Sequence, residues 1–135
     1  MLKGLSHVCF VVEDVERSIA FYTEKLGLRH AFDFTGEDGK RFGAYLHFGA
    51  RTFIELFRGA PGRGGASFQH ICVEVDSMER AVAELRSRGV EVSDPKMGSD
   101  GNPQAWLADP DGNRIELHEL RPDGLQENAL ARLGG

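Results

Sequence analysis

The sequence contains two copies of one pattern, and this internal repeat constrains the fold more than any other feature. One match aligns residues 7–17 (HVCFVVEDVER) with residues 70–80 (HICVEVDSMER), and five of the eleven positions are identical. Another aligns residues 52–56 (TFIEL) with residues 113–117 (NRIEL). The offsets are 63 and 61 residues, so both copies have nearly the same internal spacing. We interpret the chain as two copies of one supersecondary unit.

The alignment also predicts the boundaries of the two modules. The first is expected at about 4–59 and the second at about 67–120, with a glycine-rich linker at about 59–66 and a tail at 121–135. A chain of 135 residues can bury about two-thirds of its unfolded surface as one domain. We therefore predict a single domain that contains both modules.

Each module is predicted to run as a strand, a helix and three further strands. The first helix should begin after Asp14, a good N-cap residue, and end at Gly27, which suits a left-handed helix terminus. Ser77 and Gly89 flank the second helix in the same way. The predicted strands are 7–12, 28–34, 42–48, 51–57, 68–75, 90–93, 104–108 and 113–120, and the predicted helices are 15–26, 78–88 and 125–133. The fold class is therefore α+β.

Side chains on a strand point alternately to its two faces. In residues 7–12, apolar Val8, Phe10 and Val12 alternate with a second set that begins with a histidine. Apolar residues likewise flank the glutamate in each copy of the second match. One face of each sheet is then apolar and can be covered by a helix. The other face carries the repeated polar residues, which are His7, Glu55, His70 and Glu116.

Two imidazoles and two carboxylates suit one divalent metal ion, with Ni, Zn, Co, Mn and Fe(II) as candidates. A carboxylate buried on a sheet face costs several kcal/mol unless it is paired or bound to metal. The alternative is that each histidine is a satisfied core residue and each glutamate lies at a wet strand edge. Repetition of the residues at matching positions favours the metal site.

Composition and charge argue against some classes of binding partner. The net charge is −5 and the basic residues are scattered, which argues against a nucleic-acid partner. No apolar run approaches the roughly 20 residues that span a bilayer, and the first residues lack a signal-peptide core. The two cysteines form no disulfide framework. We predict a cytoplasmic protein with no membrane or nucleic-acid partner.

These motifs resemble the vicinal oxygen chelate superfamily, which includes glyoxalase I, extradiol dioxygenases, methylmalonyl-CoA epimerase, and the fosfomycin and bleomycin resistance proteins. The resemblance covers residues 4–120 and rests on His7, His70, the segment 14–27 and the segment 109–117 (DPDGNRIEL). It implies two βαβββ modules that form a cupped mixed sheet with helices on the outer face. The cup holds the metal and a small-molecule substrate. The modules pair within one chain or across a dimer, and we expect a homodimer.

Glyoxalase I is the most similar branch, because its ligand order is also His, Glu, His, Glu. The resemblance implies a lyase or isomerase that transfers a proton through a metal-stabilised enediolate, with Glu116 and Glu55 as the acid/base pair and Glu116 as the first choice. Two positions differ from the family pattern. Val11 stands where glyoxalase I has an arginine and Gly59 where it has an asparagine, which argues against glutathione as the cosubstrate.

Three alternatives remain open. One is a non-catalytic small-molecule binding protein of the bleomycin resistance type. Another is a fosfomycin-type thiol transferase, since residues 96–101 resemble its anion-binding loop. The least favoured is an Fe(II) extradiol dioxygenase, because no histidine lies between His70 and His118, where its acid/base histidine would fall. We expect Cys9 and Cys72 to line the site as small buried residues.

Overall fold

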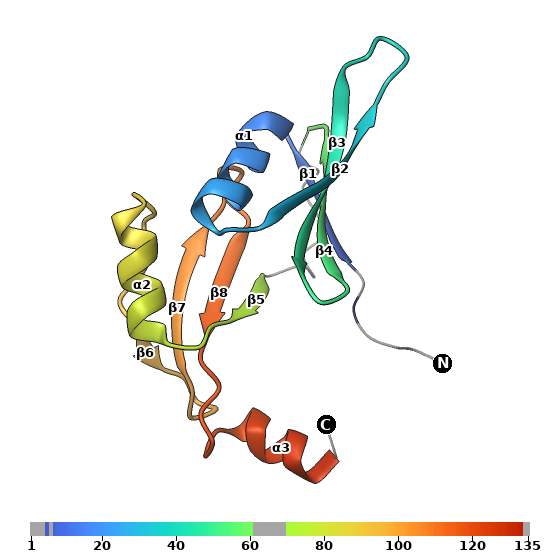
Figure 1. The fold of residues 1–135 in the computed structure, drawn as a ribbon. Coiled ribbons are helices and arrows are strands. Elements are labelled where there is room, and N and C mark those ends of the chain that lie inside the picture. The colour runs from blue at the N-terminus through green and yellow to red at the C-terminus, as the bar shows by residue number, and fades with distance from the viewer. Residues whose placement is uncertain (1–4, 6, 61–69, 134–135) are drawn as a thin grey trace. The chain divides into compact units, whose positions relative to one another are not determined.

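The computed structural model describes residues 5, 7–60 and 70–133 (Figure 1). Contacts divide the chain into two compact units. One comprises Met1–Phe68 with Asp109–Asp111, and the other comprises Gln69–Ala108 with Gly112–Gly135. Across the described ranges, no helix combines the length and the apolar character that crossing a bilayer requires.

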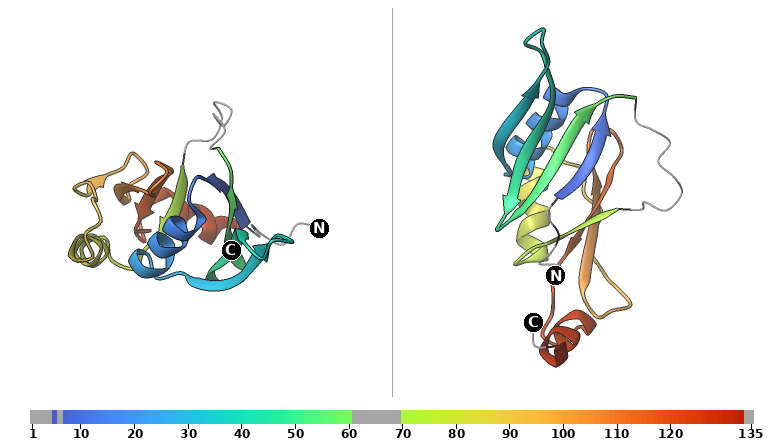
Figure 2. Two further views of the ribbon diagram at one scale, coloured as in Figure 1. Left: turned by 90° about the horizontal axis from the view of Figure 1, so that it is seen from above. Right: turned by 90° about the vertical axis from the view of Figure 1, so that its right-hand side faces the viewer.

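The first unit is a four-stranded mixed sheet with one helix against it, as the right-hand view in Figure 2 shows. Its elements are β1 (His7–Val12), α1 (Val15–Ala20), the π-helical turn η1 (Phe21–Lys25), β2 (Arg29–Thr35), β3 (Arg41–Gly49) and β4 (Thr52–Arg58). The strand order is β1-β4-β3-β2. β1 is parallel to β4, and the other neighbours are antiparallel.

The first helix begins and ends at the predicted residues but changes type on the way. Asp14 Oδ1 accepts a hydrogen bond from the Arg17 amide at 3.0 Å, and Gly27 has a φ of +78°. From Phe21 the helix continues as a π-helical turn. The Thr23 hydroxyl donates to the Ile19 carbonyl at 2.7 Å and competes with the regular backbone bond, which accounts for the change.

A segment between two strands of the second sheet packs into the first unit. The buried Tyr22 hydroxyl donates to Asp109 Oδ2 at 2.9 Å. The Ser18 hydroxyl donates to Asp111 Oδ2 at 3.2 Å, and the Glu13 amide donates to Asp111 Oδ1 at 3.1 Å. Burial and the nearby carboxylates raise the pKa of Tyr22, so this phenol stays protonated. These bonds make Asp109–Asp111 part of the first unit.

The second unit repeats the topology of the first. Its elements are β5 (Ile71–Glu74), α2 (Met78–Ser87), β6 (Lys96–Met97), β7 (Pro103–Ala108), β8 (Arg114–His118) and α3 (Leu125–Leu133). The strand order is β5-β8-β7-β6, with β5 parallel to β8. Ser77 caps α2 by accepting from the Arg80 amide at 3.3 Å, and Gly89 follows with a φ of +78°. Two βαβββ modules of α+β class are therefore confirmed.

One strand was predicted in the wrong place. Residues 90–93 form no strand, and the corresponding edge strand is β6. The carbonyl of Val92 accepts from the Arg86 side chain at 2.8 Å, so it is taken out of sheet pairing. Pro95 has no amide hydrogen to donate, and ladder pairing begins only after it. The predicted strand 68–75 begins at Ile71, and residues 67–69 lie outside the described part.

Each sheet contains a hairpin turn of the same kind. In residues 36–40 the Gly36 amide donates to the Lys40 carbonyl at 2.9 Å, and in residues 98–102 the Gly98 amide donates to the Asn102 carbonyl at 2.8 Å. Asp38 and Asp100 each accept a hydrogen bond from the backbone amide two residues later. The segment 96–101, which resembles an anion-binding loop, thus consists of β6 and part of this turn.

Candidate metal centre

The first predicted pair of ligands comes together on the open face of the first sheet. His7 opens β1 and Glu55 lies on the adjacent parallel strand β4. His7 Nε2 is 3.0 Å from Glu55 Oε2, with side-chain exposures of 39% and 11%. Ile54 and Leu56, the neighbours of Glu55, are 2% and 0% exposed in the core. The alternation of faces predicted from the sequence is confirmed here.

The second pair has the same geometry in the second unit. His70 precedes β5 and Glu116 lies on β8, which pairs with β5 in parallel. His70 Nε2 is 3.0 Å from Glu116 Oε2, with side-chain exposures of 33% and 14%. Ile115 and Leu117 are buried on the opposite face. Each module therefore presents one imidazole and one carboxylate in nearly the same setting.

The atoms in each pair suit a borderline divalent ion. In each pair an imidazole nitrogen lies 3.0 Å from a carboxylate oxygen. Nitrogen and oxygen ligands lie about 2.0–2.2 Å from zinc, so two such atoms 3.0 Å apart can bind one ion when that imidazole nitrogen carries no proton. Among the described residues, no three His, Cys, Asp or Glu side chains form a group that could hold a metal. Each pair thus offers two ligands.

Tyr45 is a site residue that the sequence analysis missed. It lies on β3 directly opposite Glu55, and its hydroxyl donates to Glu55 Oε2. This hydrogen bond, with some desolvation and the charge of Glu55, raises the pKa of Tyr45 to about 12. The signal was present in the repeat, because Tyr45 precedes Glu55 by ten residues and Trp106 precedes Glu116 by ten.

Trp106 occupies the matching place in the second unit. It lies opposite Glu116 on β7, and its ring meets the His70 ring edge-on at 4.9 Å. The Arg114 guanidinium lies 4.3 Å from the Trp106 ring centre, a cation–π contact. Trp106 and Lys96 both line a hollow of about 420 Å³. Trp106 thus forms a wall beside His70.

The two cysteines are cross-strand neighbours of the two glutamates. Cys9 lies opposite Glu55 and Cys72 opposite Glu116. Burial, followed by the charge of Glu116 and a hydrogen bond to it, raises the pKa of Cys72 to about 11. Burial and the charge of Glu55 raise the pKa of Cys9 as well. Both thiols are exposed, so the expectation that they are buried is wrong.

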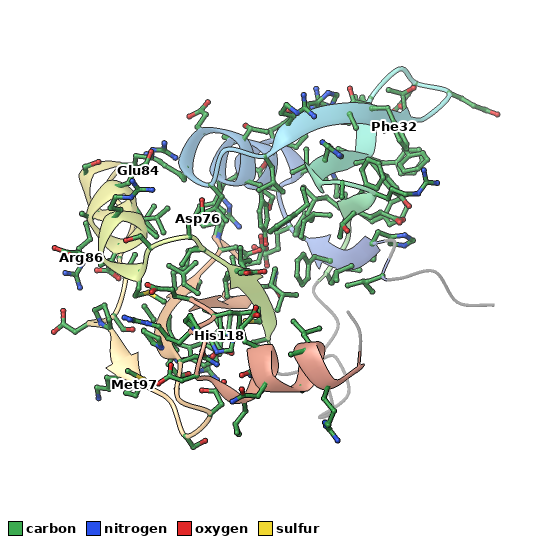
Figure 3. The ribbon with its side chains drawn as sticks, turned by 60° about the horizontal axis from the view of Figure 1, so that its bottom comes forward. Phe32, Asp76, Glu84, Arg86, Met97 and His118 are labelled. Carbon is green, nitrogen blue, oxygen red and sulfur yellow. The ribbon has the colours of Figure 1, made fainter. Side chains whose placement is uncertain are left out.

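His118 follows Glu116 on the same strand face and is held in a polar network. Its Nε2 lies 3.0 Å from Asp100 Oδ2, and the Gln126 amide donates to the same oxygen at 2.7 Å. Hydrogen bonds from Gln126 and Asn102 lower the pKa of Asp100 to about 2. His118 is therefore tied to the start of α3 rather than free in solvent (Figure 3).

Aromatic rings cover much of the open face of the first sheet. Phe32, labelled in Figure 3, lies on the edge strand β2. Its ring stacks on Tyr45 at a centroid distance of 4.6 Å, and Phe34 stacks on Phe57 at 5.3 Å. Phe32 and Phe42 remain 46% and 42% exposed. We call this set the aromatic face; it consists of Phe32, Phe34, Phe42, Tyr45, Phe53 and Phe57.

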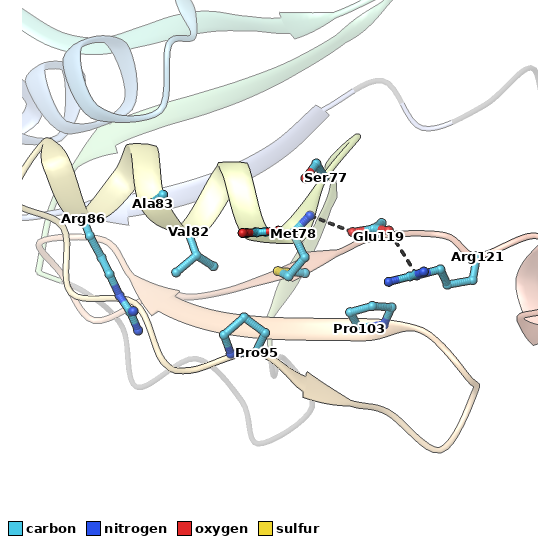
Figure 4. Close-up of a pocket in the computed structure, with 10 residues that line it drawn as sticks. Ser77, Met78, Val82, Ala83, Arg86, Pro95, Pro103, Glu119 and Arg121 are labelled. Atoms are coloured by element: carbon cyan, nitrogen blue, oxygen red, sulfur yellow. Dashed lines mark hydrogen bonds and ion pairs between the residues drawn. The ribbon is translucent and has the colours of Figure 1, made fainter.

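A hollow of about 500 Å³ lies on the helix side of the second unit, between α2 and β7 (Figure 4). Three charged side chains that line it, Arg86, Glu119 and Arg121, are in ion pairs. Glu119 accepts from the Met78 amide at 2.7 Å and lies 3.1 Å from Arg121, and Arg86 lies 2.8 Å from Asp94. None of the four predicted ligands lines this hollow. It is therefore separate from the His70–Glu116 pair.

The chain is similar in sequence and fold to known proteins. Residues 4–117 match the model of the Glyoxalase/Bleomycin resistance protein/Dioxygenase superfamily. The chain is 30% identical over 129 residues to the uncharacterized protein YwkD of Bacillus subtilis, covering 88% of this chain and 98% of that protein. It is also 30% identical over 128 residues to the lactoylglutathione lyase of Salmonella typhimurium, covering 89% and 95%.

Among solved structures, TnmS3, an antibiotic binding protein from Streptomyces sp. CB03234, superposes with a TM-score of 0.74 at 29% identity. The match covers 89% of this chain and 98% of TnmS3. The family model spans residues 4–117, and the duplicated βαβββ topology is consistent with this family. The chain belongs to the Glyoxalase/Bleomycin resistance protein/Dioxygenase superfamily.

Proposed function

We propose that this chain is a metal-dependent lyase or isomerase of the glyoxalase type, with His7, Glu55, His70 and Glu116 as the ligands of one divalent ion. The observation that carries the proposal is the repetition of one His–Glu pair, at 3.0 Å, on the same face of two equivalent sheets. Each pair supplies two ligands, so the proposal requires the pairs to meet, within one chain or across two copies.

The reaction would be a proton transfer between adjacent carbons of a small oxygenated substrate. A bound divalent ion would supply positive charge that stabilises an oxyanion as it develops. Glu116 would take the proton from one carbon and return it to the next, because a single carboxylate can serve as base and then as acid. His70, whose Nε2 lies 3.0 Å from Glu116 Oε2, would bind the same ion beside Glu116. Cys72 lies opposite this carboxylate on the neighbouring strand β5.

The substrate is proposed to lack glutathione. Val11 and Gly59 replace the two polar residues that glutathione-dependent members of the family have at these positions. Val11 is apolar and 42% exposed on β1, so it offers no hydrogen bond to a peptide carboxylate. A smaller or less charged thiol adduct, or a substrate without a thiol, fits this surface better. A homodimer and a cytoplasmic location remain predictions from the sequence.

Metal analysis of protein purified without chelators tests the proposal. We expect one equivalent of a divalent ion, or restoration of one equivalent by Ni²⁺, Zn²⁺, Co²⁺, Mn²⁺ or Fe²⁺. The loaded protein should exchange the carbon-bound hydrogen of hemithioacetals, formed from a 2-oxoaldehyde and small thiols, in D₂O. Glu116→Gln keeps a ligand oxygen but cannot act as a base, so exchange should be lost. Glu74→Gln is the control. Glu74 lies on β5 and is not one of the four proposed ligands, so this variant should exchange normally.

The second candidate function is small-molecule binding without catalysis. The exposed aromatic face supports it, as does similarity to an antibiotic binding protein. The same experiment separates the two candidates. Protein that takes up no divalent ion, yet binds an aromatic ligand with quenching of tyrosine or tryptophan fluorescence, would favour the binding protein and reject the lyase. Exchange that survives in Glu116→Gln would place the base elsewhere.

A further inference from the structure

The two proposed carboxylate ligands face different residues at the same cross-strand position. Tyr45 lies opposite Glu55 and Trp106 lies opposite Glu116. Tyr45 donates a hydrogen bond to Glu55, whereas the described contacts of the Trp106 side chain are with the His70 ring and the Arg114 guanidinium. Only the first carboxylate therefore receives a phenol hydrogen bond from its cross-strand neighbour.

The Tyr45 hydroxyl meets the carboxylate oxygen that also faces the histidine. Glu55 Oε2 accepts from Tyr45 and lies 3.0 Å from His7 Nε2. The Tyr45 ring meets the His7 ring edge-on at a centroid distance of 5.5 Å. One phenol thus contacts both members of the first pair.

Neighbouring rings fix the position of this phenol. Phe32 stacks on the Tyr45 ring at 4.6 Å with an interplanar angle of 13°, and Phe53 and Phe34 contact it at 5.7 and 5.9 Å. A side chain packed among three rings loses little further freedom when its hydroxyl holds a ligand. The aromatic face therefore provides the support that a positioning residue needs.

We propose that Tyr45 is a positioning residue that holds Glu55 in the orientation in which it binds the metal ion. This role rests on the proposed function, because it requires Glu55 to be a ligand. Partners that hydrogen-bond to a ligating carboxylate set its direction, and losing one costs about 10–100-fold in metal affinity. Tyr45 does this for the first pair alone.

The test compares the metal affinity of Tyr45→Phe with that of the unaltered chain, by competition with a chromophoric chelator for Zn²⁺ and Co²⁺. We expect Tyr45→Phe to bind about tenfold more weakly and to shift the visible absorption of bound Co²⁺. Tyr22→Phe is the matched control, because it removes the other phenol–carboxylate bond of the first unit, from Tyr22 to Asp109 at 2.9 Å. It should lower the Tm but leave the affinity and the Co²⁺ spectrum unchanged.

The outcomes separate this role from the proposed function. If the unaltered chain binds no divalent ion, both are overturned. If it binds metal and Tyr45→Phe binds equally well with the same Co²⁺ spectrum, the role of Tyr45 is overturned and the metal centre stands. An equal loss of affinity in Tyr22→Phe would mean general loosening of the unit, and would also overturn the assignment.

Discussion

In the first unit the Glu55 carboxylate lies among aromatic rings, whereas in the second unit Glu116 lies between a tryptophan and a polar network. The pairs themselves are alike, with an imidazole nitrogen 3.0 Å from a carboxylate oxygen in both. The residue two places after each glutamate differs, because Phe57 joins the aromatic face and His118 binds Asp100. The His–Glu pair is therefore the same in both units, but its surroundings are aromatic in the first unit and polar in the second.

The matching hairpin turns, residues 36–40 and 98–102, also differ in their surroundings. Asp38 accepts a hydrogen bond from the Lys40 amide, and Asp100 accepts one from the Asn102 amide. In the second unit Asp100 also binds His118 and Gln126, and so links the turn to β8 and α3. The turn of the first unit is a surface hairpin, whereas the turn of the second unit also binds the C-terminal helix through Asp100.

The strongest way to break the equivalence of the two pairs is to remove one histidine at a time. We expect His7→Ala and His70→Ala each to weaken metal binding by more than about 100-fold. Loss of a hydrogen bond that only supports a ligand costs about 10–100-fold. Chelator competition measures both. If His7→Ala abolishes binding while His70→Ala leaves it intact, the first pair would hold the ion without the second.

The next effect sharpens the contrast between the two turns. Asn102 is fully buried; its side chain donates to Gln126 at 2.6 Å and accepts from the Arg121 amide at 2.7 Å. Asn102→Ala leaves these groups without partners, and should lower the free energy of unfolding by about 1–3 kcal/mol. Urea unfolding measures the change.

The matched control is Lys40→Ala, at the same place in the first turn. Lys40 is exposed, so the free energy of unfolding should change by no more than about 0.5 kcal/mol. Equal losses in both variants would mean that the turns carry equal weight, contrary to the comparison. Gly124→Ala offers a second check, because a Cβ at that position would overlap the Asn102 side chain.

Local signals in the sequence predicted most of the fold. The bounds of β1 and α3 are those expected, and Asp14, Ser77, Gly27 and Gly89 act as predicted, because capping depends on residues within one turn of the helix end. Repetition of the pattern predicted the four ligands to share the face opposite the core, and each His–Glu pair is found there.

Features that depend on distant partners were not predicted. The Tyr22–Asp109 bond joins residues 87 positions apart, and no periodicity encodes it. β6 was misplaced because side chains take over bonds that a strand at 90–93 would need. The Arg86 side chain donates to the Val92 carbonyl, and the Trp106 amide donates to the Ser93 hydroxyl, which leaves one backbone bond from Ser93 to β7. Tyr45 was overlooked because an aromatic residue on a strand is usually explained by packing alone.

The smallest expected effect is a pH dependence confined to the second turn. Hydrogen bonds hold the pKa of Asp100 at about 2 in the folded chain, below its ordinary value of 3.8. Between these values the unfolded chain binds more protons than the folded chain, so acid favours unfolding. The stabilisation is complete above about pH 4 and is lost as the pH falls toward 2.

Asp100→Asn should remove this part of the acid dependence, whereas Asp38→Asn, at the matching place in the first turn, should leave it unchanged. Urea midpoints measured from pH 5 to pH 2 would show the difference as a shallower slope for Asp100→Asn alone. Parallel slopes for the two variants would mean that Asp100 is no better held than Asp38, and that the C-terminal helix draws no stability from its link to the turn.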